Sequence, residues 1–320
     1  MAASRDDCDR SVILSGCRTA FGKLGGGLAA LSATDLGGIV IKEAIARAGI
    51  APDDVDHLLM GMVLQAGAGQ IPSRQAGFKA GLRPTITSDT INRVCGSGMR
   101  TVTLADVLLR CGEYEAIVAG GMESMSNAPY LLDKARFGGY RLGDGVLIDS
   151  MVWDGLTCAI GGVHMGVHGG NVAAEENVSR EEQDRWALRS HQLAVAATER
   201  GIFAEEIVPV EVPGPKGSVT LVDRDESPRA DTSLEKMARL KPAFKEDGTV
   251  TAGNAPGVND GASALVVTSA AGRASGASSR WRRSWRTRPP PGRCPTWPTP
   301  RRWRRSVRST RRASASGTST

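Results

Sequence analysis

The sequence predicts an α/β fold built from stacked layers of helices and parallel strands. Two observations in the first third of the chain support this prediction. Apolar, strand-like runs alternate with segments of helical periodicity, and one helical segment is apolar on every face. The full length of 320 residues is sufficient for one large or two ordinary domains with a sizeable core.

The expected elements follow one another in a regular order. Strands are predicted at residues 11–16, 57–65, 85–94 and 115–121, and helices at residues 34–50, 73–81 and 97–110. Strands that alternate with helices in this way are typical of a parallel sheet. In the helix 97–110 the apolar side chains point in almost every direction, so we expect it to be buried on all sides.

The middle of the chain interrupts this pattern. Residues 123–251 are glycine-rich and loop-like up to Gly170, and then contain a long polar helix at 179–201 and proline-rich, charged segments. We interpret them as an insertion into the α/β domain, which comprises residues 1–122 and 252–270. After the insertion the chain returns to this domain, and the apolar run 264–269 is its expected strand there.

Residues 271–320 differ from the rest in charge and composition. They contain 14 Arg and no Lys, Asp or Glu. Since the whole chain has 40 basic and 34 acidic residues, residues 1–270 have 26 and 34 and carry a net charge of −8. The tail has no Leu, Ile, Met or Phe, so it cannot supply a packed core and we expect it to be disordered.

Two interpretations of this Arg, Pro, Ser and Trp-rich tail remain open. One is out-of-frame translation that begins shortly after Val267, because these residue types are what GC-rich codons give in another frame. The other is an RNA-binding tail, in which arginines contact phosphates and four interleaved tryptophans stack on bases. We expect no sequence-specific nucleic-acid partner, although a cationic tail binds nucleic acid non-specifically.

Several protein classes are excluded by composition. The six cysteines form no CxxC pair and no clustered spacing, which argues against a zinc site and a disulfide framework. We expect no metal site. The opening MAASRDDCDR lacks the apolar stretch of a signal peptide, and no run of about 18 apolar residues occurs. We therefore expect a cytoplasmic protein without a membrane partner.

The stretch NRVCGSG places Cys95 where a predicted strand turns into a predicted helix. A thiol is a useful nucleophile only as the thiolate, and the N–H groups and dipole at a helix N-terminus favour that anion. Gly96 and Gly98 permit a tight turn and close approach of a substrate. A small buried cysteine at a glycine turn is the alternative interpretation.

A second motif, GGMES, follows one crossover later. We interpret Gly120–Gly121 as a turn at the same sheet edge as Cys95, where α/β proteins bind ligands. The alternative is a glycine turn with two methionines that serve only packing.

Seven stretches together resemble the thiolase family, which includes acetyl-CoA acetyltransferases and 3-ketoacyl-CoA thiolases. They occur in the family's order and spacing across about residues 11–270. The stretches are RTAFGKLGGGLAALSATDLG, NRVCGSGMR, VAGGMESMSNAPY, DGLTCAIGGVHMG, SREEQDRWALRSHQLA, EIVPVEV and LEKMARLKPAFKEDGTVTAGNAPGVNDGASALVV. The resemblance implies a thiolase-like layered α-β-α fold.

The resemblance also implies an activity and its residues. Cys95 is the nucleophile that takes an acyl group from acyl-CoA as a thioester, and its backbone N–H is one donor of an oxyanion hole. Residues 123–251 match the loop domain that holds coenzyme A. Coenzyme A and acyl-CoA are substrates, with no permanently bound cofactor, and thiolases are homodimers or homotetramers. The implied coenzyme A contacts are Leu156, His164, Met165, Arg229 and Ala255.

The sequence departs from the family pattern in three places. Pro256 stands where the family usually has a serine, and HGGN at 168–171 stands where TAEN is usual. The NEAF, GHP and CxGGG motifs of the family's second α/β half, which packs over the helix after the nucleophile, do not occur.

Losing one general base costs about 10²–10⁴-fold in rate, so we expect turnover by this chain to be hard to detect. We also expect an exposed apolar patch on the helix 97–110.

Two other function classes remain open. A ketosynthase-type condensing enzyme also uses a cysteine nucleophile but acts on carrier-bound chains, and HMG at 164–166 together with the long loop domain favours coenzyme A instead. A non-catalytic acyl-CoA-binding protein is the third possibility. Binding of acyl-CoA without acylation of Cys95 distinguishes it from an enzyme.

Overall fold

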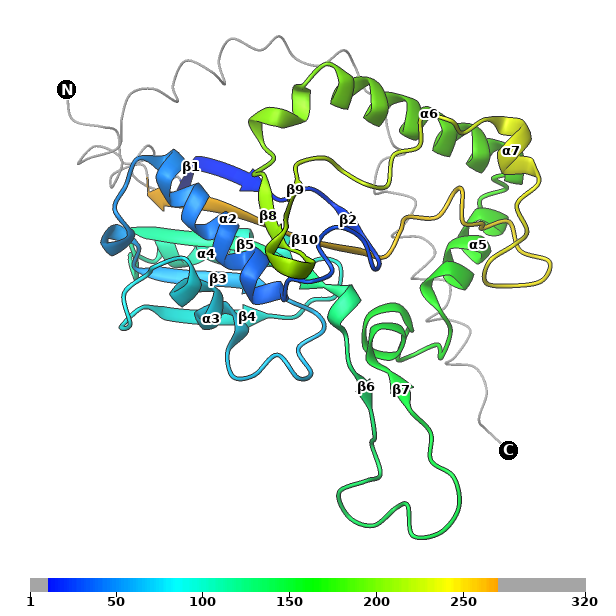
Figure 1. Cartoon of the computed structure of the whole chain (residues 1–320), viewed down its shortest axis with the longest axis horizontal. Coiled ribbons are helices and arrows are strands. Elements are labelled where there is room, and N and C mark those ends of the chain that lie inside the picture. The colour runs from blue at the N-terminus through cyan, green and yellow to red at the C-terminus, as the bar shows by residue number, and fades with distance from the viewer. Residues whose placement is uncertain (1–10, 270–320) are drawn as a thin grey trace, which may run out of the picture. The chain divides into compact units, whose positions relative to one another are not determined.

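The computed structural model describes residues 11–269. Its centre is a six-stranded sheet in which β2 pairs only with β10 and the other strands have the order β1-β10-β5-β3-β4 (Figure 1). The strands of this sheet are β1 (Ser11–Arg18), β2 (Gly22–Lys23), β3 (His57–Gly61), β4 (Thr87–Ile91), β5 (Ala116–Ser124) and β10 (Asn259–Ser269). Three helices pack on it: α2 (Ala33–Ala48), α3 (Pro72–Lys79) and α4 (Ser97–Arg110).

The expectation of a wholly parallel sheet is wrong for β10. β3 is parallel to both β4 and β5, whereas β10 is antiparallel to its neighbours β1, β2 and β5. The chain reaches β10 only after the long excursion that follows β5, so the short right-handed crossover that imposes parallel pairing does not apply here.

Residues 125–258 contribute no strand to the central sheet. Their helices are α5 (Met165–Glu175), α6 (Arg180–Glu199) and α7 (Leu234–Ala238), and their strands form two small antiparallel pairs, β6 (Tyr130–Leu131) with β7 (Ile148–Asp149) and β8 (Val210–Pro213) with β9 (Val219–Val222). The polar helix predicted at 179–201 is confirmed as α6. The short helical turns of the described chain are η1 (Pro52–Asp54), η2 (Met125–Asn127), η3 (Met151–Leu156), η4 (Ile202–Glu205) and η5 (Pro215–Gly217).

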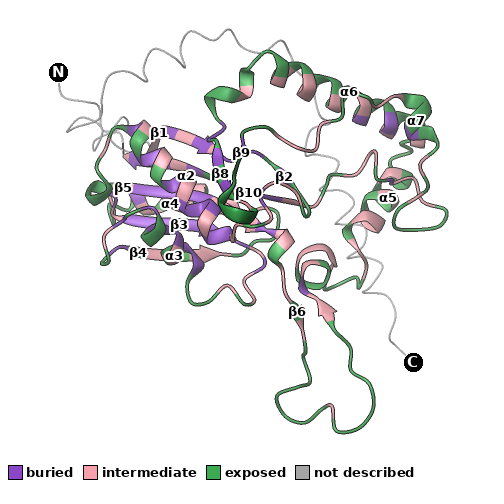
Figure 2. Ribbon diagram, in the orientation of Figure 1, coloured by how far each residue is buried: buried purple, intermediate pink, exposed green. Residues whose placement is uncertain are grey.

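The sheet buries both of its faces, and alternate residues of each strand serve opposite sides. Leu58 and Met60 of β3 lie in the large core under α2 and α3, while Leu59 between them lies in a smaller core under α4. Because side chains alternate with a period of two, the strands present apolar residues on both faces. Helices cover both faces, which gives the α-β-α layers (Figure 2).

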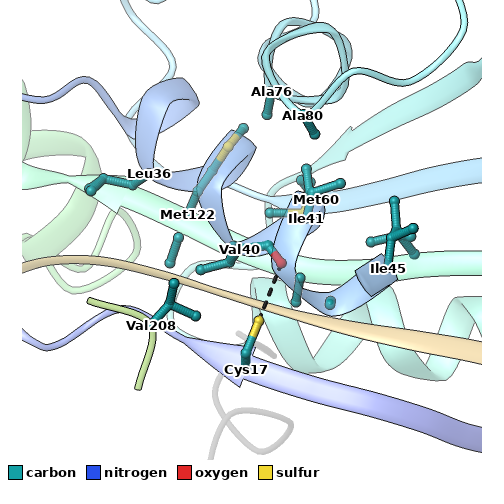
Figure 3. Packing of buried hydrophobic residues seen from close by; sticks show 14 of the residues in the cluster. Cys17, Leu36, Val40, Ile41, Ile45, Met60, Ala76, Ala80, Met122 and Val208 are labelled. Atoms are coloured by element: carbon teal, nitrogen blue, oxygen red, sulfur yellow. Dashed lines mark hydrogen bonds between the residues drawn. The ribbon is translucent and has the colours of Figure 1, made fainter. Parts of the chain in front are cut away.

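The large core contains one thiol and is otherwise mainly aliphatic (Figure 3). Cys17 of β1 donates from Sγ to the Val40 carbonyl of α2 at 3.2 Å, so its polar atom has a partner. Burial raises the pKa of the Cys17 thiol to about 12. This cysteine is therefore a packed core residue and is chemically inert at neutral pH.

Local sequence signals explain where α2 and α4 begin and end. Ser32 and Asp35 form a reciprocal capping box at the start of α2, and Gly49 ends it with φ 71°. In contrast, α4 has no side-chain cap at its N-terminus, which is the end that follows Cys95. Four N–H groups at a helix start lack intrahelical partners, so this end favours a negative charge.

The helix α4 buries one face only. Ala105 and Leu109 lie against the sheet, whereas Met99 is 76% exposed and Val107 is 48% exposed. The expectation that this helix is buried on all sides is therefore wrong for this chain, because nothing in residues 11–269 covers its outer face. The exposure of Met99 and Val107 agrees with the expectation of exposed apolar side chains on this helix.

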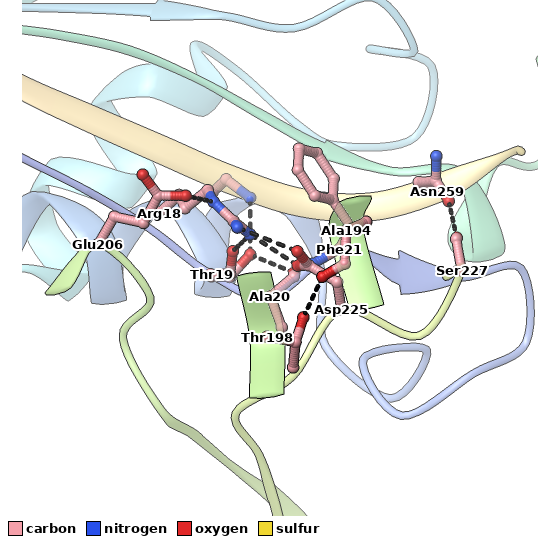
Figure 4. Close-up of polar contacts among 11 residues, drawn as sticks. Arg18, Thr19, Ala20, Phe21, Ala194, Thr198, Glu206, Asp225, Ser227 and Asn259 are labelled. Carbon is pink, nitrogen blue, oxygen red and sulfur yellow. Dashed lines mark hydrogen bonds and ion pairs between the residues drawn. The ribbon is translucent and has the colours of Figure 1, made fainter. Parts of the chain in front are cut away.

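Arg18 at the end of β1 joins the sheet to the loop that precedes α7 (Figure 4). Its Nη1 and Nη2 atoms donate to the two carboxylate oxygens of Asp225 at 2.7 and 3.0 Å, and its Nε donates to Glu206 at 2.8 Å. The side chains of Arg18 and Asp225 are only 15% and 9% exposed, so the pair is largely desolvated. A bidentate, desolvated pair fixes the relative position of the two segments.

We expect Arg18→Met to lower the free energy of unfolding by about 3 kcal/mol, because the buried Asp225 carboxylate loses its cation. Urea denaturation of both proteins measures the difference. The control is Arg110→Met, which removes the exposed 3.8 Å pair with Asp106 and should cost no more than about 0.5 kcal/mol. Equal losses in the two variants would contradict a special role for Arg18.

Candidate active site

Cys95 lies in the sharp connection between β4 and α4 and is exposed. The preceding Val94 has φ 48°, in the left-handed region. A β-branched side chain is a genuine outlier there, and such a conformation costs about 1–3 kcal/mol. The surrounding contacts must therefore hold the turn in place. The alternative interpretation of Cys95 as a buried packing residue is wrong, because the residue is exposed.

Two side chains hold this turn from its two ends. The Asn92 Oδ1 atom accepts the Val94 N–H at 2.9 Å. The Ser97 hydroxyl accepts the Arg93 N–H at 2.8 Å and donates to the Val94 carbonyl at 2.6 Å. Since Ser97 is buried, its bonds are shielded from water. The result is a rigid turn whose exposed residue is Cys95.

Glycines set the distance between α4 and the sheet. A Cβ atom at Gly61 would lie 2.6 Å from the backbone N of Gly98, and one at Gly121 would lie 3.3 Å from the Gly98 Cα. Thr101 adds a buried bond from its hydroxyl to the Gly120 carbonyl at 2.9 Å. The first turn of α4 thus rests directly on the backbones of β3 and β5.

The prediction that Gly120–Gly121 is a turn is wrong. Both residues lie within β5, where they pair with Met60 and Gly61 of β3. They nevertheless contact the first turn of α4, so the GGMES motif does lie next to the Cys95 turn. Glycine is needed here for close backbone approach rather than for a reversal of the chain.

Among the expected coenzyme A contacts, Leu156 follows a residue that packs near the loop after β3. It ends η3, and a Cβ atom at the adjacent Gly155 would lie 3.4 Å from the Leu64 side chain. Leu64 belongs to the loop after β3, whose Val63 carbonyl accepts the Asn92 side-chain amide at 3.3 Å. Gly155, next to Leu156, and Asn92, three residues before Cys95, therefore lie near the same loop.

The other expected contacts lie elsewhere on residues 164–255. His164 caps α5 by accepting the Gly166 N–H on Nδ1 at 3.0 Å, and its ring stacks on Phe244 at 4.5 Å. Met165 is half-exposed. The Arg229 side chain is exposed, and the Ala255 N–H donates to the Thr251 carbonyl at 3.0 Å. Within residues 11–269 no hydrogen bond or ion pair joins any of these four residues to the Cys95 turn.

Sequence reasoning missed a second chemically unusual cysteine. The Cys158 Sγ atom accepts the Gly161 N–H at 3.3 Å. This bond, together with the nearby His168 imidazole, lowers the pKa of the Cys158 thiol. The signal was present in the sequence, since His168 is the first residue of the HGGN departure from the family pattern.

We expect Cys158 to react with iodoacetamide at neutral pH roughly threefold faster or more than a free cysteine peptide. A lowered pKa means that more thiolate is present at a given pH, so the rate rises at lower pH than for the peptide. His168→Ala should remove much of the difference. Peptide mass spectrometry measures the rate, and Cys17 serves as the unreactive internal control. Equal rates for Cys158 in both proteins would rule out a contribution from His168.

The α/β fold thus presents an exposed cysteine on a tight turn at the start of a helix that has no side-chain cap. Residues 11–271 match the family model described as "Thiolase, N-terminal domain". The chain belongs to the thiolase family. Within residues 11–269 no helix is long and apolar enough to cross a membrane.

Named relatives agree with this assignment. The chain is 52% identical over 256 residues to an acetyl-CoA acetyltransferase of Escherichia coli (strain K12), covering 80% of this chain and 65% of that protein. It is 50% identical over 260 residues to an acetyl-CoA acetyltransferase of Cupriavidus necator, covering 81% of this chain and 66% of that protein.

Two solved structures of acetyl-CoA acetyltransferases are also similar. The Bacillus anthracis structure has a TM-score of 0.80 and 39% identity, covering 82% of this chain and 66% of that one. The Syntrophomonas wolfei structure has a TM-score of 0.78 and 44% identity, covering 81% and 64%. The chain thus spans slightly less than two thirds of the length of these proteins.

Proposed function

We propose that the chain is an acyl-CoA acyltransferase of the thiolase type, in which Cys95 carries the acyl group. The observation that supports it best is the exposed cysteine on a strained, doubly held turn at the uncapped N-terminus of α4. In a member of the thiolase family, this arrangement suits a thiolate that attacks an acyl carbonyl.

The proposed first step is transfer of the acyl group from the thioester of acyl-CoA to the Cys95 thiolate, which forms a new thioester. The Cys95 thiolate adds to the carbonyl carbon of acyl-CoA, a bond forms between Sγ and that carbon, and the bond to the coenzyme A sulfur breaks. The coenzyme A thiolate leaves and takes a proton from solvent. The Cys95 backbone N–H is proposed to donate to the oxygen that becomes negative during the addition. A later acceptor takes the acyl group from Cys95, and this gives reversible thiolysis or Claisen condensation.

We propose that residues 123–251 hold coenzyme A through Leu156, His164, Met165 and Arg229. Ala255, which follows this segment in the sequence, is proposed as a further contact. The half-buried Leu156 beside the Leu64 loop supports an apolar wall for the pantetheine arm. The exposed Arg229 suits a phosphate group. We further propose a cytoplasmic protein that binds no permanent cofactor and forms a homodimer or homotetramer.

Incubation of the purified chain with acetyl-CoA tests the proposal. We expect mass spectrometry to find one acetyl group on the Cys95 peptide, which hydroxylamine removes because it is a thioester. Binding of acetyl-CoA by equilibrium dialysis without acetylation would indicate a non-catalytic acyl-CoA binder. Acylation only by a carrier-bound malonyl group would indicate a ketosynthase-type enzyme. If the chain neither binds acetyl-CoA nor becomes acylated, the proposal is overturned.

A further inference from the structure

Glu123, near the end of β5, binds the loop that follows β3. Its Oε2 atom accepts the Val63 N–H at 2.8 Å and its Oε1 atom accepts the Leu64 N–H at 3.2 Å. Both carboxylate oxygens are thus used on two consecutive backbone donors. Hydrogen bonds to an ionised acceptor are stronger than neutral ones, so this single side chain fixes the course of the loop.

The loop transmits this constraint to the Cys95 turn. The Val63 carbonyl accepts the Asn92 side-chain amide at 3.3 Å, and the other end of that amide accepts the Val94 N–H at 2.9 Å. A continuous chain of hydrogen bonds therefore runs from Glu123 through the loop and Asn92 to Val94. Since Val94 has φ 48°, its conformation depends on such external bonds.

Within the described residues, the surroundings of Glu123 give its carboxylate two backbone donors and no cation. Burial raises the pKa of the Glu123 carboxyl, and the nearby Asp260 raises it further, while the Val63 and Leu64 N–H groups oppose both effects. No ion pair to Glu123 occurs in the described part of the chain, residues 11–269. Asp260 is itself occupied, because it accepts the N–H and hydroxyl of Ser126. A partly buried carboxylate without a cation is costly unless its hydrogen bonds are needed.

We propose that Glu123 is a positioning residue for Cys95. Acting through the loop 62–65 and Asn92, it holds Val94 in its strained conformation and so keeps the Cys95 thiol exposed at the first turn of α4. The inference rests on the proposed function only in taking Cys95 as the acyl acceptor. The hydrogen-bond chain itself is independent of the substrate.

The test uses Glu123→Gln, which keeps the size of the side chain but presents an NH₂ group to one of the two backbone donors. The measurement is the rate of Cys95 alkylation by iodoacetamide, determined peptide by peptide, divided by the rate of the exposed Cys111 in the same molecule. We expect this ratio to fall by about three- to tenfold as the strained turn relaxes. Removal of a negative charge would by itself favour the thiolate and raise the ratio, so a fall identifies positioning.

Asn92→Ala provides a second, independent variant. Asn92 is exposed, so its replacement is not expected to prevent folding. If both residues act in one chain, Asn92→Ala lowers the ratio to a similar extent, and the double variant is no lower than the worse single variant. Additive effects would contradict the relay through Asn92.

The matched control is Asp184→Asn on α6. Asp184 is a buried carboxylate that accepts from Arg180 at 2.8 Å and from Asn254 at 2.9 Å, with no bond to the Cys95 turn. This variant should lower the melting temperature but leave the Cys95 to Cys111 ratio unchanged. An unchanged or raised ratio in Glu123→Gln, or an equal fall in the control, overturns the inference. The alkylation ratio is measured without acyl-CoA. If the ratio falls as expected but no acetyl thioester forms on Cys95, the proposed function is refuted and the inference about Glu123 stands.

Discussion

Replacement of Cys95 by alanine is expected to abolish acetyl transfer from acetyl-CoA to the protein. The Cys95 Sγ is the atom proposed to form the thioester, and the Ser97 hydroxyl of the same turn is buried and hydrogen-bonded. Cys95→Ser should acetylate at least about 100-fold more slowly, because a hydroxyl without an adjacent base is a weak nucleophile. Intact-mass measurement over time, with radiolabelled acetyl-CoA as a second readout, gives both rates.

Two other cysteines provide matched controls for this experiment. Cys111→Ala removes an exposed thiol at the opposite end of α4 and should leave acetylation unchanged. Cys158→Ala removes the thiol whose pKa is lowered by Gly161 and His168. If Cys95→Ala acetylates at the wild-type rate and the label is found on Cys158, the assignment of the nucleophile is wrong.

The sequence predicted element positions better than strand direction. The helix 97–110 was predicted at its observed bounds because the glycines before it and its length both agree. The direction of β10 was predicted wrongly, since a buried apolar strand has the same composition whether it runs parallel or antiparallel. Only the hydrogen-bond partners, which lie more than 130 residues away for β5, decide this direction.

The candidate site was predictable in its local part and not in its long-range part. NRVCGSG contains Cys95 together with Asn92 and Ser97, so the residues that hold the turn were within the motif. No role was predicted for Glu123, which belongs to the GGMES motif. Its partners Val63 and Leu64 are about 60 residues away, and no spacing rule connects them. Such contacts depend on β3 and β5 being neighbours in the sheet.

The GGMES glycines were misread for a related reason. Glycine in a sequence signals either a turn or a close backbone approach, and these uses cannot be separated without a partner. Neither Gly120 nor Gly121 has a positive φ. Their lack of a side chain is required by β10 on one side and α4 on another, both distant in the sequence.

Gly120→Ala is accordingly expected to lower the free energy of unfolding by about 3 kcal/mol or more. A Cβ atom at this position would lie 2.0 Å from the Ser263 carbonyl oxygen and 3.0 Å from the Ala264 Cα, both backbone atoms of β10. No side-chain rotation relieves such a clash, so β5 and β10 must separate. Urea denaturation and the yield of folded protein measure the loss.

Gly98→Ala is the control, because a Cβ atom there would have its nearest neighbours at 3.8 Å. It lies in the first turn of α4, where alanine is a better helix former than glycine, so stability should be unchanged or higher by up to about 1 kcal/mol. Similar stabilities of the two alanine variants would contradict the close-packing argument.

The loss of close packing at Gly120 also affects α4. Separation of β5 from β10 also disturbs the Thr101 bond to the Gly120 carbonyl, which holds α4 on the sheet. The position of Cys95 above the sheet therefore depends on backbone contacts that only glycine permits, and any Gly120→Ala protein that still folds should show altered Cys95 alkylation.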